Sequence, residues 1–145
     1  MHTALSQALF EADTLQLTDT KALRFRWILH TVAYPIIECS FTEVNRTTLR
    51  VRLDCADWNE TPPAIALMDS AGAPLECAPA NPTSVFHQGP HPSTGMPFVC
   101  MPGTREYHTH SSHTGDTWEP RRTAPNYRLA DILMQVWHAW LKGSS

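Results

Sequence analysis

The spacing of apolar residues predicts an amphipathic helix near each end of the chain. From Thr3 to Leu15 apolar residues recur three or four positions apart, as on one helix face, and Thr3 is a candidate N-cap. These residues are Leu5, Ala8, Leu9, Ala12 and Leu15. A longer stripe begins near Asn126 and stops at Gly143, and it comprises Leu129, Ile132, Leu133, Val136, Trp137, Trp140 and Leu141. Because such a stripe normally packs against another layer, both tryptophans are expected in the core.

Between these helices the hydrophobic period changes to two, which is the period of strands with one buried face. Every second residue is apolar over 23–30, 37–42 and 48–55, and residues 64–68 can add a fourth strand. Pro35 and the Asn45-Arg46 pair interrupt the alternation and suit the connecting turns. The order predicts an α+β fold, with a four-stranded antiparallel meander and helices on one face of the sheet.

The segment from Ala71 to Thr123 lacks this regularity. Prolines recur along it, and no helical or strand period persists. A long irregular stretch in a small domain is usually functional or disordered, so this segment is the place to look for chemistry. With 145 residues, of which 42% are hydrophobic, the chain is expected to form one domain over residues 1–143.

Charge and hydropathy argue against two classes of partner. The formal net charge is −3 and the isoelectric point is about 6.2, so no strong positive field would attract nucleic acid. The first residues lack the basic and apolar regions of a secretion signal, and no apolar run is long enough to cross a bilayer. We therefore expect a cytoplasmic protein that binds neither nucleic acid nor membrane.

The four cysteines are widely spaced along the chain and form no Cys-x-x-Cys pair. In a reducing cytoplasm they are expected to be free thiols. Cys39 and Cys55 fall on the apolar phase of predicted strands, and Cys77 has no polar companions, so these three are expected to be structural or incidental. Cys100 differs because it lies in the irregular segment among short motifs.

These motifs, in chain order, are Trp58 with Pro62-Pro63, His91-Pro92-Ser93, Cys100, Trp118-Glu119-Pro120 and the predicted helix over residues 129–141. Together with the predicted meander, this order resembles the ubiquitin-conjugating enzyme family. Its members carry an aromatic-Pro-x-x-Pro-Pro turn, a His-Pro-Asn box, a cysteine shortly afterwards, and a Trp-x-Pro before a helix. The similarity covers most of the chain. It implies a UBC-like fold with an N-terminal helix, a four-stranded antiparallel meander, a long active-site loop and a C-terminal helix.

The resemblance also implies an activity for Cys100. This residue would be the nucleophile of an acyltransferase that accepts a ubiquitin-like protein from an activating-enzyme homologue as a thioester. It would then pass the modifier to a lysine or another amine of a target protein. The run from Cys100 to His110 looks most like the bacterial members, which are encoded beside a ubiquitin-like protein, an activating-enzyme homologue and a JAB-type deubiquitinase. Their operons are linked to antiviral defence, and no cofactor or metal is expected.

Three features depart from the family's pattern. Ser93 stands where the family has the asparagine that holds the loop and stabilises the oxyanion, which leaves the oxyanion donor open. The segment from Cys100 to Trp118 is longer than is usual in the family. The N-terminal helix has no Lys or Arg, whereas typical eukaryotic members use basic residues there, so a different activating partner is implied. His91 is expected to hold the loop, as the family's box histidine does.

Three histidines within six residues, His108, His110 and His113, follow Cys100 and precede Asp116. On an extended segment the first two would point to one side, and His113 could complete a three-nitrogen zinc site. A second interpretation is an accessory catalytic role, in which a neutral imidazole or Asp116 beside Cys100 orients the incoming lysine and accepts its proton. The third interpretation is a solvated polar loop.

Two other functions compete with conjugation. A small cupin-like protein would use His108-x-His110 on a strand as ligands for iron or zinc, although the glutamate that usually follows such a pair is missing. A non-catalytic member of the conjugating-enzyme fold would only bind ubiquitin-like proteins, and the presence of Cys100 argues against it. The sequence therefore favours a conjugating enzyme.

Overall fold

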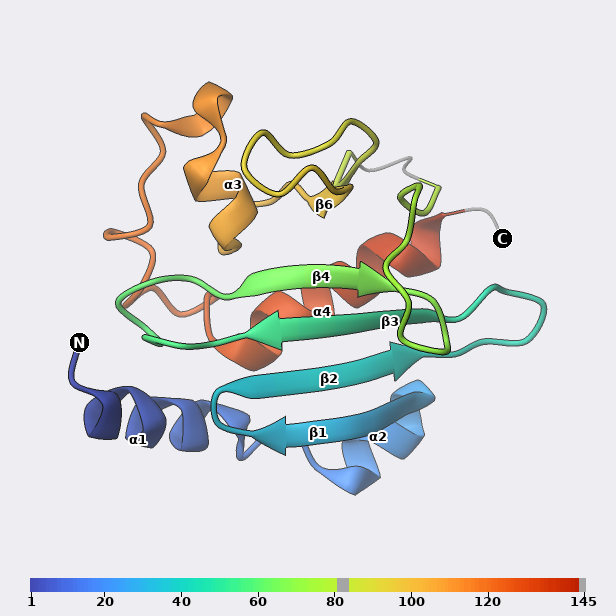
Figure 1. Ribbon diagram of the computed structural model, residues 1–145. Helices are drawn as coiled ribbons and strands as arrows, with labels where there is room; N and C mark the ends of the chain where they lie inside the picture. The colour runs from blue at the N-terminus through green and yellow to red at the C-terminus, as the bar shows by residue number, and fades with distance from the viewer. Residues whose placement is uncertain (81–83, 144–145) are drawn as a thin grey trace.

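The computed structural model describes residues 1–80 and 84–143, which form an α+β architecture (Figure 1). The helices are α1 (Thr3–Thr14), α2 (Asp19–Phe25), α3 (Arg105–Thr109) and α4 (Leu129–Lys142), with a 3-10 turn η1 (Ser111–His113). The strands are β1 (Trp27–Ala33), β2 (Ile36–Phe41), β3 (Leu49–Asp54), β4 (Ala64–Met68), β5 (Phe86–His87) and β6 (Phe98–Val99). The predicted N-terminal helix, four-stranded antiparallel sheet and C-terminal helix are confirmed. Within these residues no helix has both the length and the apolar character that crossing a bilayer requires.

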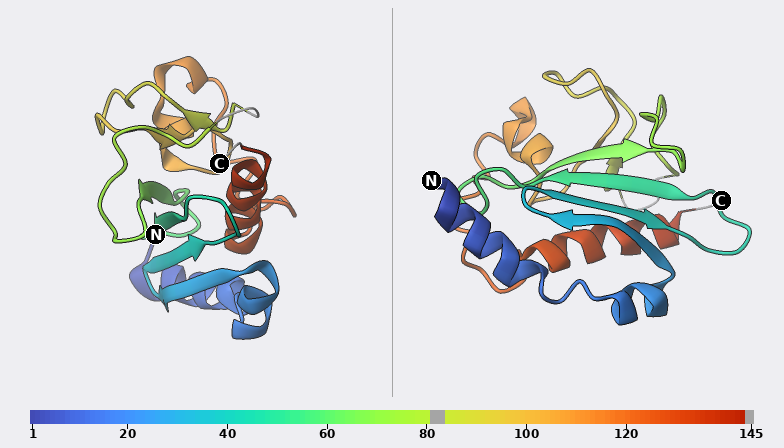
Figure 2. Two further views of the ribbon diagram at one scale, coloured as in Figure 1. Left: turned by 90° about the vertical axis from the view of Figure 1, so that its right-hand side faces the viewer. Right: turned by 60° about the horizontal axis from the view of Figure 1, so that its bottom comes forward.

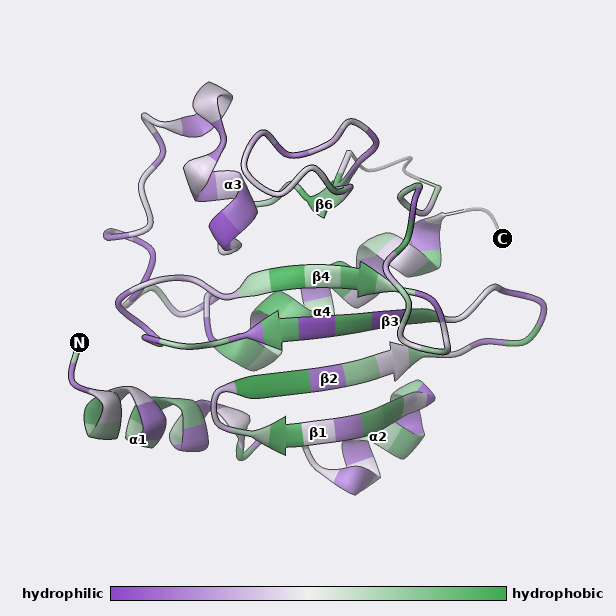
Figure 3. Cartoon of the chain, in the orientation of Figure 1, coloured by the Kyte–Doolittle hydropathy of each residue, from purple (hydrophilic) through white to green (hydrophobic). Residues whose placement is uncertain are grey.

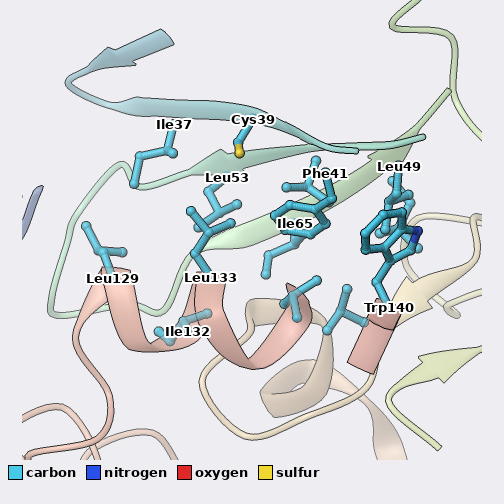
Figure 4. Packing of buried hydrophobic residues seen from close by; sticks show 14 of the residues in the cluster. Ile37, Cys39, Phe41, Leu49, Leu53, Ile65, Leu129, Ile132, Leu133 and Trp140 are labelled. Carbon is cyan, nitrogen blue, oxygen red and sulfur yellow. The ribbon is translucent and has the colours of Figure 1, made fainter. Parts of the chain in front are cut away.

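Helix α4 covers one face of the sheet and forms the main core with it (Figure 2). The strands pair in the order β1-β2-β3-β4, and hydrophobic and hydrophilic residues alternate along β2 and β3 (Figure 3). In Figure 4 the side chains of Leu129, Leu133 and Trp140 point from α4 toward the sheet. Trp137 is only partly buried and packs on Phe25 and Trp27, with ring centroids 5.0 and 5.7 Å away. The predicted stripe is therefore the inner face of α4.

Residues 23–30 do not form the single strand that their alternation predicts. Helix α2 occupies the first part, Arg26 ends it in a left-handed conformation with φ of 61°, and β1 starts at Trp27. The helix is capped because the Thr18 hydroxyl accepts a hydrogen bond from the backbone N–H of Lys21. The alternating residues therefore belong to two elements, the end of α2 and the start of β1.

The first helix is confirmed, but its buried face is not the predicted apolar stripe. Leu5 and Leu15 are 52% and 77% exposed, whereas the buried residues are Ser6, Phe10, Asp13 and Thr14. The Asp13 carboxylate turns this face inward because it accepts hydrogen bonds from Trp58 Nε1 and from Arg128, both at 2.9 Å. A polar contact across the fold thus overrides the local apolar pattern.

The turns of the meander lie where the sequence predicts them, whereas the first helix cap does not. Pro35 lies between β1 and β2, and Asn45, with φ of 63°, lies between β2 and β3. His2 rather than Thr3 caps α1, since its Nδ1 accepts a hydrogen bond from the N–H of Ala4. The imidazole nitrogen satisfies one of the donors that a helix start leaves free.

The irregular segment over 71–123, of which residues 81–83 lie outside the described part, is ordered by short elements. Strands β5 and β6 pair antiparallel, with Phe86 opposite Val99. Helix α3 and the η1 turn follow, and α3 contacts both β4 and β6 (Figure 1). None of these elements is long enough to show a period in the sequence.

The outer edge of β4 is covered by this segment. Glu106 of α3 is buried, and its Oε1 accepts a hydrogen bond of 2.8 Å from the N–H of Ile65. Two residues further along β4, the carbonyl of Leu67 accepts a hydrogen bond from the N–H of Leu75. Burial raises the pKa of Glu106, because desolvation disfavours the charged carboxylate.

The packing of α4 predicts a large loss of stability for Leu133→Ala. Leu133 is fully buried, so the truncation leaves a cavity and should lower the unfolding free energy by about 2–5 kcal/mol. Leu23→Ala is the matched control, because Leu23 on α2 is 82% exposed and its truncation should change stability by less than about 0.5 kcal/mol. Urea unfolding of both variants measures the difference, and equal losses would contradict the assigned core.

Candidate active site

Cys100 directly follows β6 at the edge of the small β5–β6 sheet. Its backbone N–H donates to the carbonyl of Val85, which continues the pairing of the two strands by one residue. Its side chain is partly exposed. Cys39 and Cys55 are fully buried in the main core, as their strand phase predicts, and Cys77 is exposed. Cys100 and Cys77 are therefore the two thiols that a reagent in solution can reach.

The side chain that pairs with the Cys100 thiol is that of His113 in η1. Its Nε2 lies 3.6 Å from Cys100 Sγ, within reach for proton transfer on a small movement. Partial burial raises the pKa of Cys100, so the resting group is a thiol that needs a base to become a nucleophile. The His113 ring lies flat on Tyr107, with centroids 4.0 Å apart and planes 14° apart.

His108 is engaged by the backbone on both ring nitrogens. The N–H of Gly103 donates to His108 Nε2 at 3.0 Å, so Nδ1 carries the proton and donates to the carbonyl of Asp116 at 2.8 Å. Burial lowers the pKa of His108, which favours this neutral form. His108 therefore ties two turns together and has no nitrogen free for substrate.

The arrangement of His108, His110 and His113 differs from the predicted extended segment. His108 lies in α3, His110 is the C-cap residue of α3, and His113 lies in η1, so the three do not share one extended segment. Both His108 nitrogens are occupied, and across residues 1–80 and 84–143 no group of three or more metal-ligating side chains is placed to hold an ion. The three rings are also only partly exposed, unlike a solvated loop.

His110 belongs to a cluster of rings around Phe98. It stacks on Phe98 at 5.7 Å, and His87 stacks on the same ring at 4.7 Å. Its Nδ1 accepts a hydrogen bond from the N–H of Ser112. Desolvation lowers the pKa of His110, and neighbouring imidazoles, His91 first, add to the effect. His110 thus packs on Phe98 and also contacts the His113 ring.

Asp116 is connected to His113 through one intervening side chain, that of Tyr107. Its Oδ2 accepts a hydrogen bond of 2.7 Å from the Tyr107 hydroxyl, and Arg121 binds both carboxylate oxygens. The Tyr107 hydroxyl and the Arg121 guanidinium hold the pKa of Asp116 below its usual range. The same bond to Asp116 raises the pKa of Tyr107 to about 12. Asp116 is therefore an ionised anchor and not the base beside the sulfur.

His91 is buried and fixes the loop that precedes β6. Its Nδ1 accepts a hydrogen bond from the N–H of Ser93 at 3.0 Å, so its Nε2 donates to the carbonyl of Glu106 at 2.8 Å. Ser93 is exposed, and its backbone N–H is the group that holds it to His91. Ser93 thus supports the loop through its backbone.

The structure brings the Cys100 thiol and the His113 imidazole together, and the His110 ring lies 5.8 Å from the rings of both His113 and His91. Ser93, His108 and Asp116 do not touch Cys100 in this arrangement and act through backbone hydrogen bonds or through Tyr107. Tyr107 was not singled out by the sequence, although its ring is the surface on which His113 lies. Nothing in its local spacing indicates this role, because the stack requires the turn between α3 and η1.

Comparison with known proteins points to the same part of the chain. The family model described as Y4jH-like, Y4jH family, matches residues 84–143. This range holds Cys100, the histidine segment and α4, and none of the four-stranded sheet. A relative described as "Uncharacterized protein y4jH", from Sinorhizobium fredii (strain NBRC 101917 / NGR234), is 44% identical over 41 residues. That match spans 28% of this chain and 20% of the relative, so the chain covers only a small part of the relative's length.

Thiol labelling of the native protein should modify Cys77 and Cys100 and spare Cys39 and Cys55. Burial raises the pKa of Cys39 to about 12 and raises that of Cys55 further, so neither forms thiolate at neutral pH. Mass spectrometry after iodoacetamide treatment, with and without denaturant, measures the pattern. Labelling of Cys39 as fast as Cys77 in the folded protein would contradict the assigned burial.

Acid should destabilise the protein through His108. Since burial lowers its pKa in the folded state, the unfolded chain binds more protons just below about pH 6.5, the ordinary value for histidine. The unfolding free energy should therefore fall as the pH drops through that range, and His108→Gln should weaken the dependence. Urea titrations at about pH 7.5 and about pH 5.5 measure it. A variant with the same pH dependence as the wild type would refute the assignment.

Proposed function

We propose that this protein is a ubiquitin-conjugating-like enzyme with Cys100 as its thioester-forming nucleophile. It accepts a ubiquitin-like protein from an activating-enzyme homologue and passes it to an amine of a target protein. The cytoplasm is the proposed compartment, and antiviral defence in bacteria is the proposed setting, both by resemblance to the bacterial members of the family. The UBC-like assignment of the fold is part of this proposal.

The observation that carries the proposal is the pairing of a partly exposed Cys100 with His113 Nε2 at 3.6 Å. A thioester carrier must offer its sulfur to two macromolecules in succession, so the sulfur has to be reachable and the segment that presents it has to be held. The β5–β6 pairing and the buried His91 hold this segment from both sides. The helix, meander, loop and helix order agrees with the motif order in the sequence.

Charging would proceed by transfer of the acyl group between two thiols. Cys100 gives its proton to His113 Nε2, and its sulfur attacks the carbonyl carbon of the thioester on the activating enzyme. That enzyme's cysteine then leaves and takes up the proton. Because one thioester replaces another, the step needs no reductant or cofactor.

In the transfer to the target, Cys100 is the leaving group instead of the nucleophile. The target amine attacks the thioester carbonyl, an amide forms, and the Cys100 sulfur leaves as thiolate. His113 accepts the excess proton of the amine and returns it to the sulfur, which balances the reaction. Because Ser93 is exposed and His113 lies beside the sulfur, the protonated His113 is the donor assigned to the oxyanion in this scheme.

A charging assay tests this proposal. With ATP, an activating-enzyme homologue and a ubiquitin-like protein, the wild type should form an adduct that reducing agent cleaves, and Cys100→Ala should form none. Cys100→Ser, if charged, should give an oxyester that resists thiols. Cys77→Ala is the matched control, because Cys77 is the other exposed thiol and its loss should leave charging unchanged.

Two outcomes would overturn the assignment. A normal adduct on Cys100→Ala would place the nucleophile elsewhere, and an adduct on Cys77 would identify it. A wild type that binds the ubiquitin-like protein tightly but forms no adduct with its cognate activating enzyme would instead indicate a non-catalytic binder.

A further inference from the structure

The position of His113 depends on Tyr107. His113 lies in the three-residue turn η1, and the residues around it, Ser111, Ser112 and Thr114, are exposed. A turn this short has little rigidity of its own. The flat stack on Tyr107 is the closest ring contact of the imidazole, so the tyrosine sets the plane in which His113 faces Cys100.

Tyr107 is oriented in turn by an ion pair. Its hydroxyl donates to Asp116 Oδ2 at 2.7 Å, and Arg121 binds the same carboxylate through Nη2 at 2.9 Å to each oxygen and through Nε at 3.1 Å. Arg121 and Asp116 side chains are 28% and 33% exposed. A bidentate guanidinium–carboxylate pair fixes the orientation of the carboxylate as well as its distance, which a single hydrogen bond does not.

Arg121 is itself attached to the start of α4. Its Nη1 donates to the Tyr127 hydroxyl, and its guanidinium carbon lies 5.2 Å from the centre of the Tyr127 ring. Tyr127 packs against the core two residues before α4 begins, and its ring contacts Trp118. A continuous series of contacts therefore runs from the best-packed helix to the imidazole beside the sulfur.

We propose that Arg121 is a positioning residue for the Cys100–His113 pair. It transmits the fixed position of α4, through Asp116 and Tyr107, to the His113 ring, and it touches neither the sulfur nor the acyl group. The inference deepens the proposed function of Cys100 and rests on it for its biological meaning. Its physical content, that Arg121 controls proton transfer between Cys100 and His113, can be measured without any partner protein.

Alkylation of Cys100 by iodoacetamide provides that measurement. In a Cys77→Ala background Cys100 is the reachable thiol, since Cys39 and Cys55 are buried. The rate, followed between about pH 6 and about pH 9, reports how far His113 assists the thiolate. Arg121→Ala should lower the rate at neutral pH by on the order of tenfold, and His113→Ala by at least as much, with the profile shifting toward that of an unassisted cysteine.

Matched variants separate positioning from general damage. Arg122→Ala should keep the wild-type profile, because Arg122 pairs with Glu119 and lies outside this series of contacts. Arg121→Lys keeps the charge but not the two-pronged geometry, so it should restore only part of the rate. Tyr107→Phe keeps the ring under His113 and removes the bond to Asp116, so it should fall between wild type and Tyr107→Leu.

Protection of Cys39 and Cys55 from the same reagent shows that each variant remains folded. If these thiols react in Arg121→Ala, that variant is unfolded, and the alkylation profile of Tyr107→Phe tests the proposal in its place. A wild-type profile for a folded Arg121→Ala, or for Tyr107→Phe when Arg121→Ala is unfolded, would overturn the proposal. Failure of charging with an intact alkylation profile would refute the conjugating function and leave the role of Arg121 standing.

Discussion

The burial of one face of α4 against the four-stranded sheet is the constraint on which the rest of the structure depends. Leu129, Leu133 and Val136 lose all contact with water in this packing, and the sheet supplies its alternate residues to the same layer. The packing fixes β4 at one end of the irregular segment and the start of α4 at the other. Strands β5 and β6 and helix α3 are too short to be stable alone, so they are ordered between these two supports.

How much of the fold could be predicted depended on the length of each element. Strands β2 to β4 and α4 repeat a period several times, and their bounds agree closely with the prediction. The prediction missed helix α2 because its last residues, Leu23, Arg24 and Phe25, alternate as a strand would, and only the Thr18 cap favours a helix. The prediction of which face of α1 is buried was wrong because Asp13 is held inward by hydrogen bonds from Trp58 and Arg128, which are distant in sequence.

The candidate site was predictable in its residues and not in their roles. Motif order singled out Cys100, and the histidine run singled out His113, but spacing could not distinguish His113 from His108. The distinction depends on which ring nitrogens the backbone occupies, and the N–H of Gly103 reaches His108 only through the turn before α3. Tyr107 was missed for the same reason, since ring stacking between short elements has no one-dimensional pattern.

The covered edge of β4 bears on how copies of this chain meet one another. Since Glu106 and Leu75 occupy hydrogen-bonding groups along that edge, β1 is the strand of the described sheet most open to pairing with a further strand. The pairing of β1 with β2 shifts register between Leu29 and Thr31, and such an irregularity twists an edge away from a flat ladder. The β1 edge therefore offers a second copy no long, flat strand to pair with. Fibril growth through edge-to-edge strand pairing is disfavoured for this reason.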